Sequence, residues 1–210
     1  MTVAALALFA LYLAMAFGLR TWVQWRRTGD TGFRGVSGRP GSPEWWAGVL
    51  FVLALVAGFL GPVMALAGLA PLPLLDATPL QATGAVITVV GIAATYLTQV
   101  DMGTNWRIGV QAGERTDLVT TGAFALVRNP IFTAMAITGL GLALMVPNVV
   151  ALSGVVLLVV ALELQVRVVE EPYLLSTHGA RYAHYTAGTG RFLPGIGRGT
   201  SSELTTEEVT

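Results

Sequence analysis

The chain has 210 residues, a net charge of zero, no cysteine and no lysine, since its 12 basic residues are all arginine. These absences exclude disulfides, thiolate metal sites, a cysteine nucleophile, a Walker A loop and a lysine Schiff base, and the scattered arginines argue against a nucleic-acid partner. Hydrophobic residues make up 54% of the chain and charged residues 11%, against about a quarter charged in a soluble domain, so the composition predicts a membrane protein.

Apolar runs that approach the length needed to cross a bilayer, about 20 residues, recur along the chain. The runs that we expect to form membrane helices are Thr2–Leu19, Trp45–Ala70, Leu80–Val100, Ile131–Val146 and Val149–Leu162. The last two are short, and the turn-forming residues Pro147 and Asn148 separate them, so they predict a helical hairpin. The sequence therefore predicts an all-α, polytopic membrane protein with about five transmembrane helices.

The arginines all fall on one side of this predicted topology. The loop over residues 20–44 holds five of them, the loop over 101–130 three and the C-terminal part four, while the 71–79 loop and the Pro147 turn hold none. By the positive-inside rule that side is the cytoplasm, so we expect the N-terminus outside and the C-terminus in the cytoplasm. The composition, rich in Ala, Val, Gly and Arg, is typical of a GC-rich genome, so we expect a bacterial cytoplasmic membrane.

The predicted topology divides the chain into three regions. Residues 1–100 hold the first three membrane helices, residues 101–195 hold most of the polar clusters, and residues 196–210 form a tail rich in Gly, Ser, Thr and Glu that we expect to be disordered. Several glycines lie inside the apolar runs, and we expect them to allow close helix packing. They include Gly84, Gly91, Gly139 and Gly141.

Two groups of charged residues in the second half are candidates for a functional site. Arg128 precedes the fourth apolar run, where an arginine either clamps an anion or only extends its charge to the interface; we favour the second reading for Arg128 alone. Glu163, Arg167, Glu170 and Glu171 are spaced i, i+4, i+7 and i+8, which places them on one face of a helix. Such residues either face a functional interior or pair with one another along a surface.

The segment after Pro172 holds both histidines of the chain. We expect a short helix over Tyr173–His178 that ends at Gly179. His184 with its neighbours Tyr182 and Tyr185 then forms either one wall of a small-molecule pocket or part of an interfacial amphipathic helix. The histidine spacing matches no metal-ligand motif, so we expect no metal site.

Two segments of the chain resemble the isoprenylcysteine carboxyl methyltransferases and their phospholipid-methylating relatives, which are membrane-embedded enzymes. The first is Leu118-Val-Thr-Thr-Gly-Ala-Phe-Ala-Leu-Val-Arg-Asn-Pro130, and the second is Glu170-Glu-Pro-Tyr-Leu174, followed by Gly179, Tyr182, Tyr185 and Arg191-Phe-Leu-Pro194. Asn129 stands where this family has His, and Phe132 stands where Tyr is common. The similarity covers residues 101–195, which we therefore expect to form a methyltransferase core.

The resemblance implies S-adenosyl-L-methionine as methyl donor, bound on the cytoplasmic side, and a lipophilic small-molecule or lipidated acceptor that enters from the bilayer. The implied cofactor-binding residues are Arg128, Asn129, Pro130, Glu170, Glu171, His178, Tyr182 and Tyr185. We expect Glu170 or Glu171 to hold the ribose hydroxyls or the ammonium group, and Arg128 to hold the carboxylate or to position its loop.

Three residues are the expected catalytic groups. Glu171 or His184 is the candidate base for a thiol or amine acceptor, which must lose a proton, whereas a carboxylate acceptor needs no base. Arg167 is the candidate partner of an anionic acceptor.

Two other functions stay open at this point. Sterol reductases resemble the same C-terminal helices, so the protein is alternatively an NADPH-dependent membrane reductase. Its phosphate clamp would then come from Arg128, Arg167, Arg181 and Arg191. A non-enzymatic membrane module is the third reading, and the charged residues between Glu163 and Glu171 argue against it.

Overall fold

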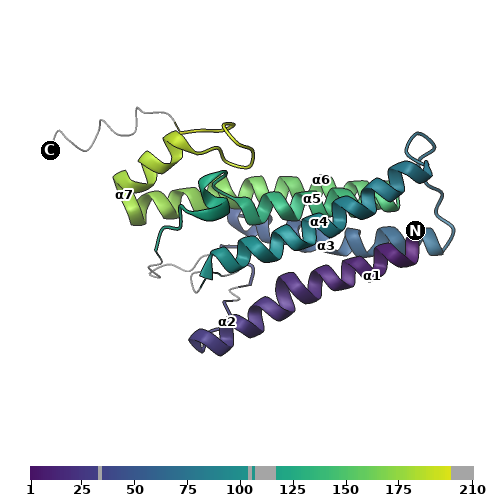
Figure 1. Cartoon of the computed structure of the whole chain (residues 1–210), viewed down its shortest axis with the longest axis horizontal. Coiled ribbons are helices and arrows are strands. Elements are labelled where there is room, and N and C mark those ends of the chain that lie inside the picture. The colour runs from purple at the N-terminus through teal and green to yellow at the C-terminus, as the bar shows by residue number, and fades with distance from the viewer. Residues whose placement is uncertain (33–34, 104–105, 107–116, 200–210) are drawn as a thin grey trace.

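The computed structural model describes residues 1–32, 35–103, 106 and 117–199, and these residues form helices without any β-strand, which confirms the all-α fold. Helices run lengthwise beside one another, and α2 and α7 lie at the end of the bundle opposite the N-terminus (Figure 1). The elements in chain order are α1 (Thr2–Leu13), the π-helix η1 (Ala14–Leu19), α2 (Arg20–Thr28), α3 (Pro43–Leu66), α4 (Thr78–Asp101), the 3-10 helix η3 (Gly122–Ala125), α5 (Pro130–Met145), α6 (Val149–Leu164), the π-helix η4 (Gln165–Glu170) and α7 (Glu171–Gly188).

Four stretches of helix are long and apolar enough to cross a membrane, namely Thr2–Thr28, Pro43–Leu66, Thr78–Asp101 and Val149–Gly188. The fifth predicted span, α5, has 16 residues and is shorter. At 1.5 Å per residue such a helix rises about 24 Å, less than the roughly 30 Å of a bilayer core. By length, the structure therefore supports four of the five predicted spans. The remaining one, α5, is too short to cross the bilayer core.

The predicted hairpin between α5 and α6 is present. The two helices are joined by residues 146–148, and Asn148 caps α6 because its Oδ1 accepts a hydrogen bond from the Ala151 backbone N–H at 2.9 Å. The Asn148 side chain also donates to the Gly61 carbonyl oxygen of α3 at 2.8 Å. The turn is thereby fixed to the neighbouring helix α3.

The first helix is longer than the sequence predicted. We expected it to end at Leu19 because a charged residue follows, but it continues through η1 and α2 to Thr28. Arg20 is buried, its guanidinium lies 4.9 Å from the centre of the Trp106 ring, and it donates a hydrogen bond to the Gly103 carbonyl oxygen. These contacts accommodate the charge inside the fold, so it does not terminate the helix.

Close packing of α4 on α5 and of α3 on α6 builds the bundle. A Cβ atom added to Gly84 would lie 2.7 Å from the Gly141 carbonyl oxygen, and one added to Gly141 would lie 2.6 Å from the Thr88 backbone nitrogen. The predicted role of these glycines in close packing is therefore confirmed. The buried Thr88 and Thr138 hydroxyls donate to backbone carbonyl oxygens four residues earlier, which satisfies them without water.

The helix that starts as α6 continues through η4 into α7. Pro172 lies in the first turn of α7, directly after the π-helix η4. Gly179 has φ 49° and ψ −130° and interrupts the helix where we predicted its end, but helical structure resumes and reaches Gly188. The interruption turns the last part of α7 back over the end of the bundle (Figure 1).

Candidate active site

A cavity of about 430 Å³ lies where the polar C-terminal part of the chain meets the apolar helices. This volume is in the range of small-molecule binding sites, roughly 300–1,000 Å³. Its polar lining comes from Ser37, Glu44, Gln99, Asp117, Arg128, Asn129, Gln165, Glu170, Glu171, Tyr173, Tyr182 and Tyr185. Its apolar lining includes Phe17, Phe51, Leu55, Phe132, Met135 and Leu162. One cavity thus offers both charged groups and hydrocarbon surface.

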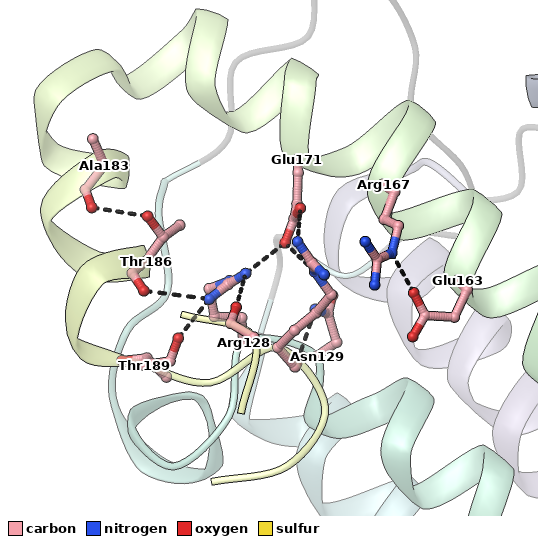
Figure 2. Close-up of polar contacts among 10 residues, drawn as sticks. Arg128, Asn129, Glu163, Arg167, Glu171, Ala183, Thr186 and Thr189 are labelled. Carbon is pink, nitrogen blue, oxygen red and sulfur yellow. Dashed lines mark hydrogen bonds and ion pairs between the residues drawn. The ribbon is translucent and has the colours of Figure 1, made fainter. Parts of the chain in front are cut away.

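Glu171 forms the centre of the polar cluster (Figure 2). Its Oε1 accepts hydrogen bonds from Arg128 Nη2 at 2.7 Å and Arg191 Nε at 2.8 Å, and its Oε2 accepts one from Arg191 Nη2 at 2.8 Å. The Glu171 side chain is 19% exposed, and that of Arg128 only 3%. Charge-assisted, bidentate contacts of this kind are strong. The hydrogen bonds to Glu171 hold the pKa of the Arg191 guanidinium above its ordinary value.

Arg128 joins three parts of the chain. Besides Glu171, its guanidinium donates to the carbonyl oxygens of Thr186 and Thr189 in and after α7, and to that of Gly197 at 3.1 Å. The contacts of the C-terminal part therefore extend to residues 197–199, past the boundary at residue 195 that we placed from the sequence, while residues 200–210 lie outside the described part.

Asn129 strengthens the same junction. Its backbone N–H and its side-chain Nδ2 both donate to the Arg191 carbonyl oxygen, at 3.0 and 3.1 Å. The Arg128 backbone N–H donates to the Gly190 carbonyl oxygen at 2.8 Å. Arg128 and Asn129 thus tie the loop before α5 to the segment after α7.

The structure brings most of the predicted cofactor-binding residues together. The cavity is lined by Arg128, Asn129, Pro130, Glu170, Glu171, Tyr182 and Tyr185. The rings of Tyr182 and Tyr185 lie 6.2 Å apart, and the Tyr185 hydroxyl donates to the Phe124 carbonyl oxygen at 2.5 Å. Residues that are far apart in the sequence therefore converge on one cavity, although their contacts with a ligand stay a prediction.

Three predicted site residues lie outside the cavity lining, namely Arg167, His178 and His184. His184 is exposed on α7, and His178 is half-buried. Arg167 is exposed and pairs with Glu163 at i,i+4 spacing, apart from the Arg128–Glu171 cluster (Figure 2). The predicted single face from Glu163 to Glu171 is thus not maintained, because the π-helix η4 intervenes and changes the helical register.

Sequence reasoning missed the contribution of the first half of the chain. Phe17 of η1, Glu44 and Phe51 of α3, and Gln99 of α4 all line the cavity. The only available signal was Gln99, a polar residue near the end of an otherwise apolar run. Within the described residues, no group of three or more His, Asp or Glu side chains is placed to hold a metal ion.

Residues 80–181 match the family described as phospholipid methyltransferase. This segment of the chain is similar to the phospholipid methyltransferases. The segment runs from the start of α4 into α7 and contains Arg128, Glu170 and Glu171, and it confirms the resemblance seen in the two sequence motifs. Arg191, which completes the Glu171 cluster, lies beyond it. A search of curated proteins found no match to the chain.

Proposed function

We propose that the protein is an integral membrane methyltransferase that uses S-adenosyl-L-methionine to methylate a lipophilic acceptor. The observation that carries this proposal is the cavity, which is lined in large part by the methyltransferase family segment. Charged residues of the loop before α5 and of α7 meet side chains of the apolar helices there. Such a cavity suits the meeting of a polar methyl donor with an acceptor from the bilayer.

The lining fits S-adenosyl-L-methionine in charge. This cofactor supplies an electrophilic methyl group on a cationic sulfonium. Among the described residues, the lining holds the four carboxylates Glu44, Asp117, Glu170 and Glu171 and the guanidinium of Arg128, and Arg191 next to Glu171 adds a second guanidinium. These groups carry an excess of negative charge, which attracts a cation.

Glu170 is our preferred residue for binding the ribose hydroxyls or the ammonium group. Glu170 lines the cavity and lies next to Glu171, whose carboxylate already accepts three hydrogen bonds from arginines. The tyrosine rings of Tyr182 and Tyr185 add flat surface for the adenine base.

In this proposal the apolar helices bind the acceptor. Phe51, Phe132 and Leu162 line the cavity on its hydrocarbon side, where they exclude water and hold the acceptor. Methyl transfer depends mainly on alignment and desolvation, because the charge on sulfur disappears as the methyl group leaves. No described histidine lines the cavity, so Glu170 and Glu171 are the nearest candidates for a base where the acceptor carries a proton.

We also propose that the cavity opens toward the cytoplasm of a bacterial cell. The arginines of α2 and α7 lie at one end of the bundle, and the N-terminus lies at the other (Figure 1). Cytoplasmic loops carry the excess of arginine in membrane proteins, so this end is assigned to the cytoplasm.

The contacts of the arginines weigh against an NADPH-dependent reductase. Arg128 and Arg191 bind Glu171, and Arg167 binds Glu163. The fourth arginine of the expected phosphate clamp, Arg181, is exposed and outside the cavity lining. The described arginines therefore do not converge on a free anion site.

The test is a calorimetric titration of the detergent-purified protein with S-adenosylhomocysteine, with NADPH in parallel. We expect S-adenosylhomocysteine alone to bind. Glu170→Gln should weaken that binding about tenfold, because a hydrogen bond to a charged group contributes about 1.5–3 kcal/mol. Glu163→Gln is the matched control, because the same substitution is made on the same continuous helix but outside the cavity. Binding of NADPH alone, or of neither compound, would refute the proposal.

A further inference from the structure

A second, smaller cavity lies among the apolar helices α1, α3, α5 and α6. Its volume is about 40 Å³, against about 430 Å³ for the main cavity. Of the described residues in its lining, Tyr12 and Thr138 alone have polar side chains, and the Thr138 hydroxyl donates to the Ala134 carbonyl oxygen. A buried water needs about two to four polar partners, so this lining favours hydrocarbon over water.

The two cavities follow one another along the same four stretches of helix. On each stretch, the residues that line the main cavity give way to residues that line the second one. The change falls between Phe17 and Tyr12 of the first helix, at Leu55 of α3, at Met135 of α5, and between Ala161 and Leu158 of α6. Because four separate stretches change at one level, the second cavity lies end to end with the main one, on the side away from the polar cluster.

Leu55 and Met135 form the boundary between the two cavities, since each of them lines both. A methionine side chain is unbranched and has several rotatable bonds, so it adapts its shape to a neighbour more readily than a branched residue does. The second cavity is also far smaller than a small-molecule site, which takes roughly 300 Å³ or more. It therefore suits one end of a ligand held in the main cavity rather than a ligand of its own.

We propose that the second cavity binds the far end of the acceptor's hydrocarbon chain, which passes between Leu55 and Met135 while the polar head stays in the main cavity. This inference rests on the proposed function, since it places the acceptor in the main cavity. It narrows the acceptor to a lipid with a long, flexible chain. Met135 and Leu142 of α5 both line the second cavity and lie about 10 Å apart along the helix, so the apolar site is lengthened by about that distance.

A bilayer lipid is the other source of hydrocarbon for the second cavity. A lipid chain that enters from the side fills the second cavity alone, whereas an acceptor chain fills both cavities at once. The shared boundary at Leu55 and Met135 favours the acceptor. A test must therefore locate both ends of one bound chain.

The probe is hexadecanol with a photoreactive diazirine placed either at the end of the chain or beside the hydroxyl. Full-length protein in phosphatidylcholine nanodiscs is irradiated with each form, and mass spectrometry identifies the labelled residues. We expect the chain-end form to label the second cavity, for example at Leu142 and Val155, and the other form to label the main cavity, for example at Phe51 and Phe132. Excess unlabelled hexadecanol should remove both sets of labels.

Filling the second cavity should separate the two labelling patterns. Val155→Phe adds a large ring to its lining, so labelling there by the chain-end form should be lost while labelling of the main cavity is retained. The retained labels also show that the variant is folded. Val156→Phe is the matched control, because the same substitution is made at the next residue of α6, which is 63% exposed and outside both linings. It should leave both patterns unchanged.

The outcomes distinguish this inference from the proposed function. Chain-end labels confined to lipid-exposed positions such as Val156 would overturn the role of the second cavity, and so would competable labels that survive Val155→Phe. Labels in the second cavity that excess hexadecanol leaves in place would assign it to a bilayer lipid instead. Absence of S-adenosylhomocysteine binding to the wild-type protein would overturn the methyltransferase proposal, while competable labels in both cavities would still identify a site for a long-chain amphiphile.

Discussion

Replacing Glu171 tests how the C-terminal segment is held on the bundle. Glu171→Gln removes the charge that Arg128 and Arg191 share, and Arg128 is almost fully buried. Breaking a buried ion pair by changing one partner costs about 3–5 kcal/mol. We take the lower end, about 3 kcal/mol, because Arg128 keeps its carbonyl acceptors and the amide keeps one acceptor oxygen.

The assay is hydrogen exchange at the backbone amides that close this segment. Arg191, Ile196 and Gly199 donate their backbone N–H groups to Ile196, Leu193 and Thr186 respectively. A loss of about 3 kcal/mol should increase local opening about a hundredfold and speed exchange at these amides accordingly.

Glu163→Gln serves as the control, because the Glu163–Arg167 pair is exposed and such pairs contribute only about 0–1 kcal/mol. The reasoning fails if Glu171→Gln changes exchange in residues 189–199 no more than Glu163→Gln does. It also fails if Glu171→Gln accelerates exchange evenly over all helices, since that would indicate a global loss of stability.

Two further predictions concern topology and packing. The chain has no cysteine, so a single introduced cysteine can report which side of the membrane it lies on. Leu74→Cys, at a position in the α3–α4 loop that is 93% exposed, should react with a membrane-impermeant maleimide in intact cells, while His184→Cys should react only in inverted vesicles. The reverse pattern would contradict the proposed orientation. Gly141→Ala places a methyl group against the backbone of α4, so it should lower the free energy of unfolding by about 1–3 kcal/mol and lower the midpoint of thermal unfolding. Gly188→Ala, with open space around its Cβ position, should leave the midpoint unchanged. Equal midpoints for the two variants would contradict the close packing of α4 on α5.

Much of the fold follows from hydrophobicity and helix-capping chemistry. The bounds of α4, α5 and α6 differ from the predicted ones by only one or two residues, because Pro79, Pro130 and Asn148 mark helix starts through local chemistry. The first helix was predicted too short, because the shelter of Arg20 against Trp106 is a long-range contact that no local pattern reveals.

The sequence predicted several residues that lie at the candidate site but not how its charged residues pair. Arg128, Glu170 and Glu171 do border one cavity. From the sequence, Arg167 was spaced to pair with both Glu163 and Glu171 or to face an acceptor. It pairs with Glu163 as the spacing allows, whereas η4 intervenes and Glu171 pairs with Arg128 and Arg191 instead. A π-helix depends on tertiary packing rather than on a local motif, so spacing rules for an α-helix could not foresee it.

The π-helix η1 and Gln99 show a second limit of sequence reasoning. The sequence analysis did not single out Gln99, which is one polar residue near the end of an apolar run. In the folded chain its side-chain Nε2 donates to the Ala16 carbonyl oxygen, and the residue is part of the cavity lining. Only the packing of α4 against η1 gives this residue its surroundings.

The hydrogen bonds that residues 189–199 make with Arg128 and Glu171 limit how far the chain can be shortened. The family segment ends at residue 181, yet Arg191 supplies two of the three hydrogen bonds to Glu171, and Thr189 and Gly197 supply carbonyl acceptors to Arg128. A version cut after residue 181 would remove five of the six hydrogen bonds described for the Arg128 guanidinium and the Glu171 carboxylate, and leave only the one that joins them. The stretch after α7 therefore belongs to the same packed structure as the family segment.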